Sequence, residues 1–85
     1  MTVRIDTTSE RSKPIVNVSG RLEDLGVQEL IRACQLIEGE FVLDLTGVRS
    51  ADPKGIDAIR KLVSGGAKLR GASPFIRLLL EPDED

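Results

Sequence analysis

The chain contains almost no aromatic residues and no histidine. Its 85 residues include two Phe, no Tyr, no Trp, no His and one Cys. Without His, and with a single Cys, the chain cannot assemble a Ser-His-Asp or Cys-His catalytic centre or a Cys/His zinc site. The shortage of aromatic rings argues against the base-stacking platforms of nucleic-acid-binding proteins. We therefore expect no enzymatic activity, no cofactor, no metal ion and no nucleic-acid partner.

Signals for export and for membrane insertion are also lacking. Residues 1–13 are polar and do not contain the apolar segment of a signal peptide. No apolar run approaches the ~20 residues that a membrane-spanning helix requires. A lone Cys cannot form an internal disulfide, which is typical of a protein in a reducing compartment. We expect a cytoplasmic protein that is not inserted in a membrane.

The length allows one small domain. A chain of 85 residues buries about 60–65% of the surface that its unfolded form exposes, so the core is thin. Hydrophobic residues make up 40% of the composition, which predicts a folded protein. The composition changes only near the end, where four acids fall within residues 81–85. We expect a domain over residues 1–80 followed by an acidic tail.

The remaining charge is unevenly distributed. The formal net charge is −2, yet the chain before the tail carries more basic than acidic residues. Seven basic and two acidic residues lie between Arg49 and Arg77, both included. This segment is either an ordinary solvated surface or a basic docking face for an acidic partner. The excess is too small to indicate a nucleic-acid-binding protein.

Hydrophobic periodicity divides the chain into four strands and three helices. An apolar stripe predicts a helix over residues 24–38, with Asp24 as N-cap and Gly39 as terminator. Asp52-Pro53 and Ser73-Pro74 each pair an N-cap residue with proline at the first helical position, so a helix should begin at each. The expected buried positions of the helices are Val27, Leu30, Ile31, Cys34, Ile37, Ile56, Ile59, Leu62, Val63, Ile76, Leu79 and Leu80, with Phe75 flanking the last group. The strands are expected at residues 3–5, 15–18, 41–46 and 68–71, with a turn over 7–14 and a loop over 47–51.

The resulting order, β-β-α-β-α-β-α, predicts an α/β fold. Strands that alternate with helices need right-handed crossovers, which give a mostly parallel sheet of about four strands with one antiparallel edge strand. Residues 41–46 are apolar at almost every position, as in a strand that is covered on both faces. Functional sites in such sheets lie outside the carboxyl ends of the strands, which here means Gly20 and the loops at 47–52 and 71–73.

Individual residues offer little chemistry. Asp44 is better explained as a hydrogen-bond partner of a neighbouring loop than as a general base, because no second acid or base is specified. Cys34 falls on the apolar stripe of the first helix without a basic neighbour, which indicates a core residue rather than a reactive thiol. Gly20 and Gly47 are interpreted as turn glycines, since the chain contains no Walker-type or GxGxxG phosphate-binding motif.

Three segments together resemble the STAS domain, a family named for sulfate transporters and anti-sigma factor antagonists. They are IVNVSGRL at 15–22, FVLDLTGV at 41–48 and GAKLRGASPFIRLLL at 66–80. In order and spacing they span residues 14–80. The resemblance implies the STAS fold and a non-catalytic regulator that binds a protein partner. In the anti-sigma factor antagonist type, that partner is an anti-sigma factor or kinase, and its capture releases a sigma factor.

The start of the second helix departs from the family pattern. STAS domains of this type usually have Asp-Ser-Ser/Thr-Gly there, and a Ser or Thr accepts phosphate from a partner kinase. This chain has Asp52-Pro53-Lys54-Gly55, so Lys54 takes the acceptor position. The phospho-switch is therefore expected to be absent, or moved to Ser50. The chain is also short for the family, which suggests a pared-down binding core whose free sheet edge or face would be covered in a homodimer.

The resemblance implies that the partner is bound by the 50–56 loop and the exposed side of the second helix. The residues that we assign to this site are Ser50, Asp52, Lys54, Gly55, Ile56, Arg60 and Lys61. Lys54 has two interpretations. It is either a substitution without a function, at a phosphorylation site that is no longer used, or a residue that contacts an anion. In the second interpretation, its ammonium and the helix N-terminus hold a partner carboxylate or a phosphate.

Two other functions are alternatives to the anti-sigma factor antagonist. The chain also looks like the short STAS-like accessory subunits that bind the ATPase of an ABC-type lipid transporter. The third alternative is a small-ligand sensor, because some STAS domains are thought to bind nucleotides or lipids. An 85-residue domain offers little volume for a ligand pocket, which places this alternative last among the binding functions.

Overall fold

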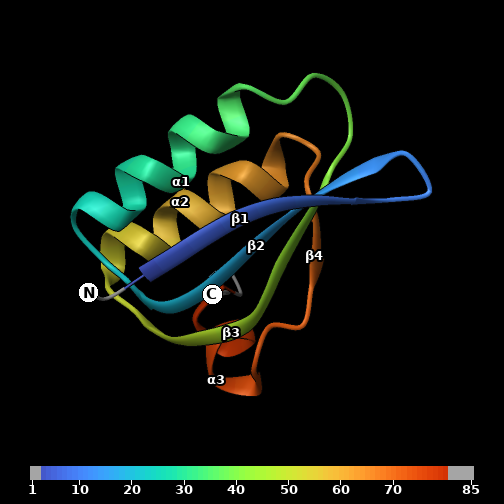
Figure 1. Cartoon of the computed structure of the whole chain (residues 1–85). Coiled ribbons are helices and arrows are strands. Elements are labelled where there is room, and N and C mark those ends of the chain that lie inside the picture. The colour runs from blue at the N-terminus through green and yellow to red at the C-terminus, as the bar shows by residue number, and fades with distance from the viewer. Residues whose placement is uncertain (1–2, 81–85) are drawn as a thin grey trace.

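The computed structural model describes residues 3–80 and contains the seven elements in the expected order (Figure 1). The strands are β1 (Val3–Glu10), β2 (Lys13–Leu22), β3 (Val42–Ala51) and β4 (Lys68–Arg70), and the helices are α1 (Leu25–Gln35), α2 (Pro53–Ser64) and α3 (Pro74–Leu80). The sheet order is β1-β2-β3-β4, with β1 antiparallel to β2 and the other neighbours parallel. The predicted α/β class and the single antiparallel edge strand are confirmed. The acidic tail lies outside the described residues.

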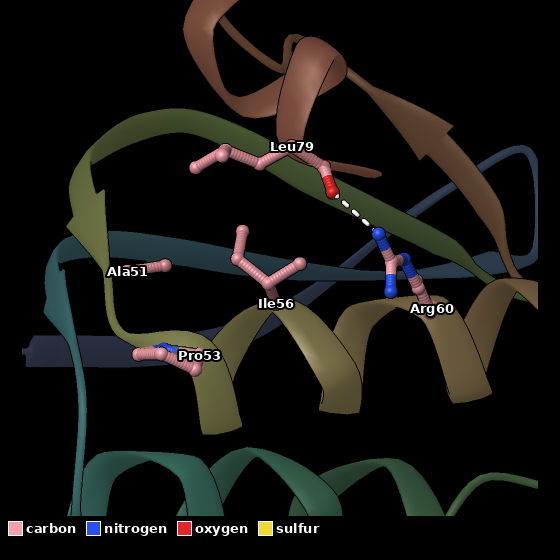
Figure 2. Close-up of a pocket in the computed structure, with 5 residues that line it drawn as sticks. All are labelled: Ala51, Pro53, Ile56, Arg60 and Leu79. Atoms are coloured by element: carbon pink, nitrogen blue, oxygen red, sulfur yellow. Dashed lines mark hydrogen bonds between the residues drawn. The ribbon is translucent and has the colours of Figure 1, made fainter. Parts of the chain in front are cut away.

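All three helices lie on one face of the sheet, side by side in the order α1, α2, α3 (Figure 2). For α1 and α2 this arrangement is expected from the topology, because right-handed crossovers that each advance one strand in the same direction place their helices on the same face. The core lies between the helices and this face. Its fully buried side chains are Val16, Val18, Leu22, Leu30, Leu43, Leu45, Ile59 and Ile76.

The face of the sheet opposite the helices, here called the open face, is not covered by a helix, contrary to one prediction. Residues 41–46 were expected to be covered on both sides, but Leu43 and Leu45 face the helices while Thr46 is exposed and Val42 and Asp44 are half-buried. The strand therefore alternates in burial, as a sheet with one covered face requires. The segment looks almost continuously apolar because two adjacent apolar residues, Phe41 and Val42, precede the part of the strand that alternates.

Three strands, β1, β2 and β3, are longer than predicted. The turn expected over 7–14 is only Arg11-Ser12, and β1 and β2 pair from Val3↔Gly20 to Glu10↔Lys13. Both turn residues have positive φ, 54° and 68°, which is the backbone of a type I′ hairpin and fits the strand twist without glycine. The loop expected over 47–51 is strand as well, because β3 continues beside β2 as far as Leu22↔Ala51 through two register shifts. Gly20 and Gly47 therefore lie in strands rather than in turns.

The helices agree with the sequence in type and differ in detail. The N-caps Asp52 and Ser73 are confirmed, since each side-chain oxygen accepts a hydrogen bond from the N–H three residues later. Asp24 occupies the N-cap position of α1 but makes no such bond, and α1 ends at Gln35 instead of 38. Val63, which was predicted to be buried, is 39% exposed, and the flanking Phe75 is 59% exposed. The predicted core positions that are only partly buried are Ile31, Ile37, Leu62, Leu79 and Leu80.

Candidate functional site

The amino end of α2 is fixed against the carboxyl end of β2. The Asp52 carboxylate accepts a 2.7 Å hydrogen bond from the Gly55 N–H, and the Asp52 N–H donates to the Leu22 carbonyl at 3.1 Å. A Cβ at Gly55 would lie 2.6 Å from that same carbonyl oxygen. Only glycine allows this approach, so the first turn of α2 has a defined position at the surface.

Lys54 projects from this first turn into solvent. Its side chain is exposed, and it has no ion pair or hydrogen bond with any residue of the described part of the chain. The first turn of a helix lies at the positive end of the helix dipole, although in α2 Pro53 has no N–H and the Gly55 N–H is taken by Asp52. Lys54 adds a full positive charge there, so this end of α2 favours an anionic group on a partner.

A shallow depression lies beside this end, between α2 and α3 (Figure 2). Its volume is about 300 Å³, and it is lined by Ala51, Pro53, Ile56, Arg60 and Leu79. The Arg60 guanidinium donates to the carbonyls of Leu79 at 2.7 Å and Leu80 at 3.2 Å. Arg60 therefore caps the last turn of α3 and forms the polar wall of the depression.

The other residues assigned from the sequence occupy distinct positions around this end. Ser50 is half-buried and pairs with Arg21 in the sheet. Gly55 and Ile56 are buried, and Ile56 is only 7% exposed. These two residues therefore position the first turn of α2 and offer little area for direct contact with a partner. Lys61 is exposed about two turns beyond Lys54 along α2. It forms an ion pair with Asp57 at 3.2 Å.

The basic residues between Arg49 and Arg77 do not gather on one face. Lys68 and Arg70 lie on the open face of the sheet, across from Val42 and Asp44. Arg77 of α3 donates to the Ala72 carbonyl, whereas the lysines of α2, Lys54 and Lys61, are exposed on that helix. A single basic docking face is thus not formed, and the positive charge near the candidate site comes from Lys54, Arg60 and Lys61.

Asp44 belongs to the open face, where it holds β3 to β4. Its carboxylate accepts bonds from the Thr46 N–H at 2.9 Å and the Arg70 guanidinium at 2.9 Å, and its side chain is 14% exposed. Burial acts to raise the pKa of Asp44, but the hydrogen bonds from Thr46 and Arg70 outweigh it and hold the pKa below its usual value. Asp44 is a hydrogen-bond partner, as predicted, although its partners belong to strands rather than to a loop.

The remaining chemical candidate, Cys34, is a core residue. It is 5% exposed within the apolar cluster under α1, and burial raises the pKa of its thiol to about 11. A thiol with that pKa is almost entirely protonated at neutral pH and is a poor nucleophile.

Within residues 3–80, no group of His, Cys, Asp or Glu side chains is arranged to hold a metal ion. No helix among these residues is long and apolar enough to cross a membrane.

Sequence reasoning missed the contribution of α3 to this surface. Leu79 lines the depression, and the nearby helix face leaves Phe75 and Leu78 59% and 67% exposed. The signal was present, because the sequence PFIRLLL is apolar around almost the whole helix. A seven-residue helix on the edge of a one-sided layer can bury only part of that surface.

The comparisons with known proteins bear on the fold. No family model matches the sequence, and no curated protein matches it. Among solved structures, the chain is similar to a crystal structure of an anti-sigma-factor antagonist, a STAS domain from Rhodobacter sphaeroides, with a TM-score of 0.61 and 18% identity. The match covers 86% of this chain and 94% of that chain. At this identity the likeness establishes the fold, so the chain has the fold of a STAS domain.

Proposed function

We propose that this protein is a non-catalytic regulatory module that binds a protein partner through the amino end of α2, in the manner of an anti-sigma factor antagonist. The observation that carries the proposal is the exposed first turn of α2. Asp52 and Gly55 fix this turn against β2, while Lys54 projects from it beside an apolar depression. The similar STAS domain from Rhodobacter sphaeroides is an anti-sigma-factor antagonist, which supports the same type of function.

The partner contact would combine charge and apolar area. A partner carboxylate beside Lys54 would also meet the positive end of the α2 dipole, which strengthens an anion contact. An apolar side chain of the partner would enter the depression over Ile56 and Leu79. A few such contacts near the centre of an interface supply most of its binding energy.

Regulation would differ from the usual phosphorylation at this turn. Pro53 and Lys54 have no hydroxyl, so neither can accept phosphate as a Ser or Thr does. Ser50 is half-buried in the sheet, which makes it a poor kinase substrate in the folded domain. The protein would then bind constitutively in the cytoplasm, or be controlled by its abundance. Intact-mass spectrometry of protein from its native cells should show the unmodified mass, and a phosphate on Ser50 would contradict this part of the proposal.

The partner can be identified by capture on the immobilised protein. The wild-type chain and a Lys54→Glu variant would be compared, with Lys68→Glu as a matched control, because Lys68 is an exposed lysine on β4. We expect an anti-sigma factor to be enriched by the wild type and by Lys68→Glu, and to be reduced about tenfold or more by Lys54→Glu. Enrichment of an ABC-type ATPase would favour the accessory-subunit alternative. Equal capture by all three chains would overturn the assignment of the site.

A further inference from the structure

The outward side of α1 carries two leucines that nothing in the described chain covers. Leu25 opens the helix and is 72% exposed, and Leu36 directly follows its last residue and is 80% exposed. Leu36 keeps helical backbone angles, with φ −80° and ψ −8°, so it continues the same face. Eleven positions at about 100° each return to the same side of a helix, roughly 16 Å further along its axis.

One acid and one base lie between these leucines on the same side. Glu29 and Arg32 are exposed, and neither side chain forms an ion pair or hydrogen bond with any residue in 3–80. The buried residues of the helix, such as Leu30 and Cys34, point the opposite way, into the core. The exposed stripe Leu25-Glu29-Arg32-Leu36, here called the α1 stripe, therefore faces directly away from the domain.

The spacing of the α1 stripe is symmetric about its centre. Its successive gaps are four, three and four residues. Two copies of α1 that pack antiparallel, with a two-fold axis between positions 30 and 31, bring Leu25 level with Leu36 of the second copy. The same axis places Glu29 level with Arg32 of the second copy. Each apolar residue then meets an apolar one and each charge meets its opposite, which is the self-complementarity that a two-fold interface requires.

We propose that the α1 stripe is a homodimer interface in which α1 packs antiparallel against α1 of a second copy. This inference does not depend on the proposed function. One pair of three-turn helices covers less area than the ~1,200–2,000 Å² of a standard stable interface, so the dimer should be concentration-dependent. The amino end of each α2 stays uncovered, because the stripe lies on the side of α1 opposite to the core. A dimer would therefore present two copies of the candidate site and bind a dimeric partner with added avidity.

Charge reversal provides a sharp test by sedimentation equilibrium over about 10 μM to 1 mM, a range that spans weak dimers. The wild type should dimerise, and Glu29→Arg and Arg32→Glu should each weaken dimerisation on the order of tenfold or more, since each places like charges opposite one another twice. An equimolar mixture of the two variants should dimerise again, because each Arg then faces a Glu of the other chain. The double variant, with both reversals in one chain, should also dimerise like the wild type.

Two further variants separate this interface from other apolar surfaces. Leu36→Ser should weaken dimerisation more than either charge reversal, whereas Leu78→Ser, at a similarly exposed leucine on α3, should leave it unchanged. Circular dichroism would check that every variant keeps its helix content. A wild type that stays monomeric up to the highest concentration would overturn the proposal. So would a dimer that Leu78→Ser disrupts, or one that persists in both single charge variants.

Discussion

The two faces of the sheet are stabilised by different forces. On the covered face, side chains such as Leu43 and Val16 are fully buried under the helices. On the open face, the strands are joined by polar pairs, among them Asn17–Thr8 at 3.0 Å and Arg70–Glu10 at 3.3 Å. Burying an apolar side chain contributes about 1.5–3 kcal/mol, whereas an exposed ion pair contributes about 0–1 kcal/mol. The covered face therefore supplies most of the stability. The polar side chains of the open face link neighbouring strands and are solvated by water.

The largest expected effect comes from two neighbouring residues on opposite faces. Leu43→Ala should lower the free energy of unfolding by about 2–5 kcal/mol, because it leaves a cavity under the helices. Val42→Ala, one residue earlier on the open face, should lower it by only about 1 kcal/mol, since Val42 is already half-buried. Urea denaturation of both variants measures the difference. Equal losses would show that the two faces contribute alike.

The next effect concerns the close contact between α2 and β2. Gly55→Ala should lower the free energy of unfolding by about 1–3 kcal/mol, because its Cβ would press on the Leu22 carbonyl. Gly65→Ala is the matched control, since the nearest atoms to a Cβ there are 3.5 Å away. Thermal unfolding of both variants provides the measurement. If Gly55→Ala were tolerated as well as Gly65→Ala, α2 would not be held as tightly as the structure indicates.

A smaller effect is expected from the open face, and it should depend on pH. The pKa of Asp44 is lower in the folded than in the unfolded chain, so its contribution is present above about pH 4 and is lost as the pH falls through the folded value. Asp44→Asn should therefore cost about 1 kcal/mol at neutral pH and progressively less below pH 4. Asp6→Asn, in the highly exposed pair with Arg4, should change little at any pH. A constant cost of Asp44→Asn across the pH range would contradict this explanation.

The smallest effect separates stability from binding at the candidate site. Lys54→Glu places a negative charge at the positive end of α2, so it should raise the free energy of unfolding by about 0.3–1 kcal/mol. The same change should weaken partner binding. A variant that is both less stable and weaker in binding would point to damage of the fold rather than to a lost contact.

The sequence predicted the element order well because the helix signals are local. Asp52-Pro53 and Ser73-Pro74 both begin helices where expected, and their caps form. The long hairpin was missed because residues 7–13 are polar on both sides, so no alternation marks them as strand. The extension of β3 to Ala51 was missed for a related reason, since it depends on pairing with β2 through register shifts, which no local pattern encodes.

The candidate site was predicted only in part. The residues of the first turn of α2 were identified because the cap, the proline and the family pattern fall together at 52–55. The depression beside it could not be predicted, because it forms where Leu79 and Arg60, nineteen positions apart, meet at the α2–α3 contact. The sequence likewise left open whether the basic residues share one face, because strand pairing, which sends Lys68 and Arg70 to the open face, is not a local signal.

The most direct test of the central claim is an NMR titration of the labelled protein with the partner recovered by capture. The claim is that the amino end of α2 and the adjoining depression contact the partner. We predict that the amide signals of Leu79 and of residues 50–56, apart from Pro53, which has no N–H, shift or broaden most, while those of the open-face residues Asn17 and Arg70 stay in place. The largest changes on the open face, with residues 50–56 unaffected, would contradict the account.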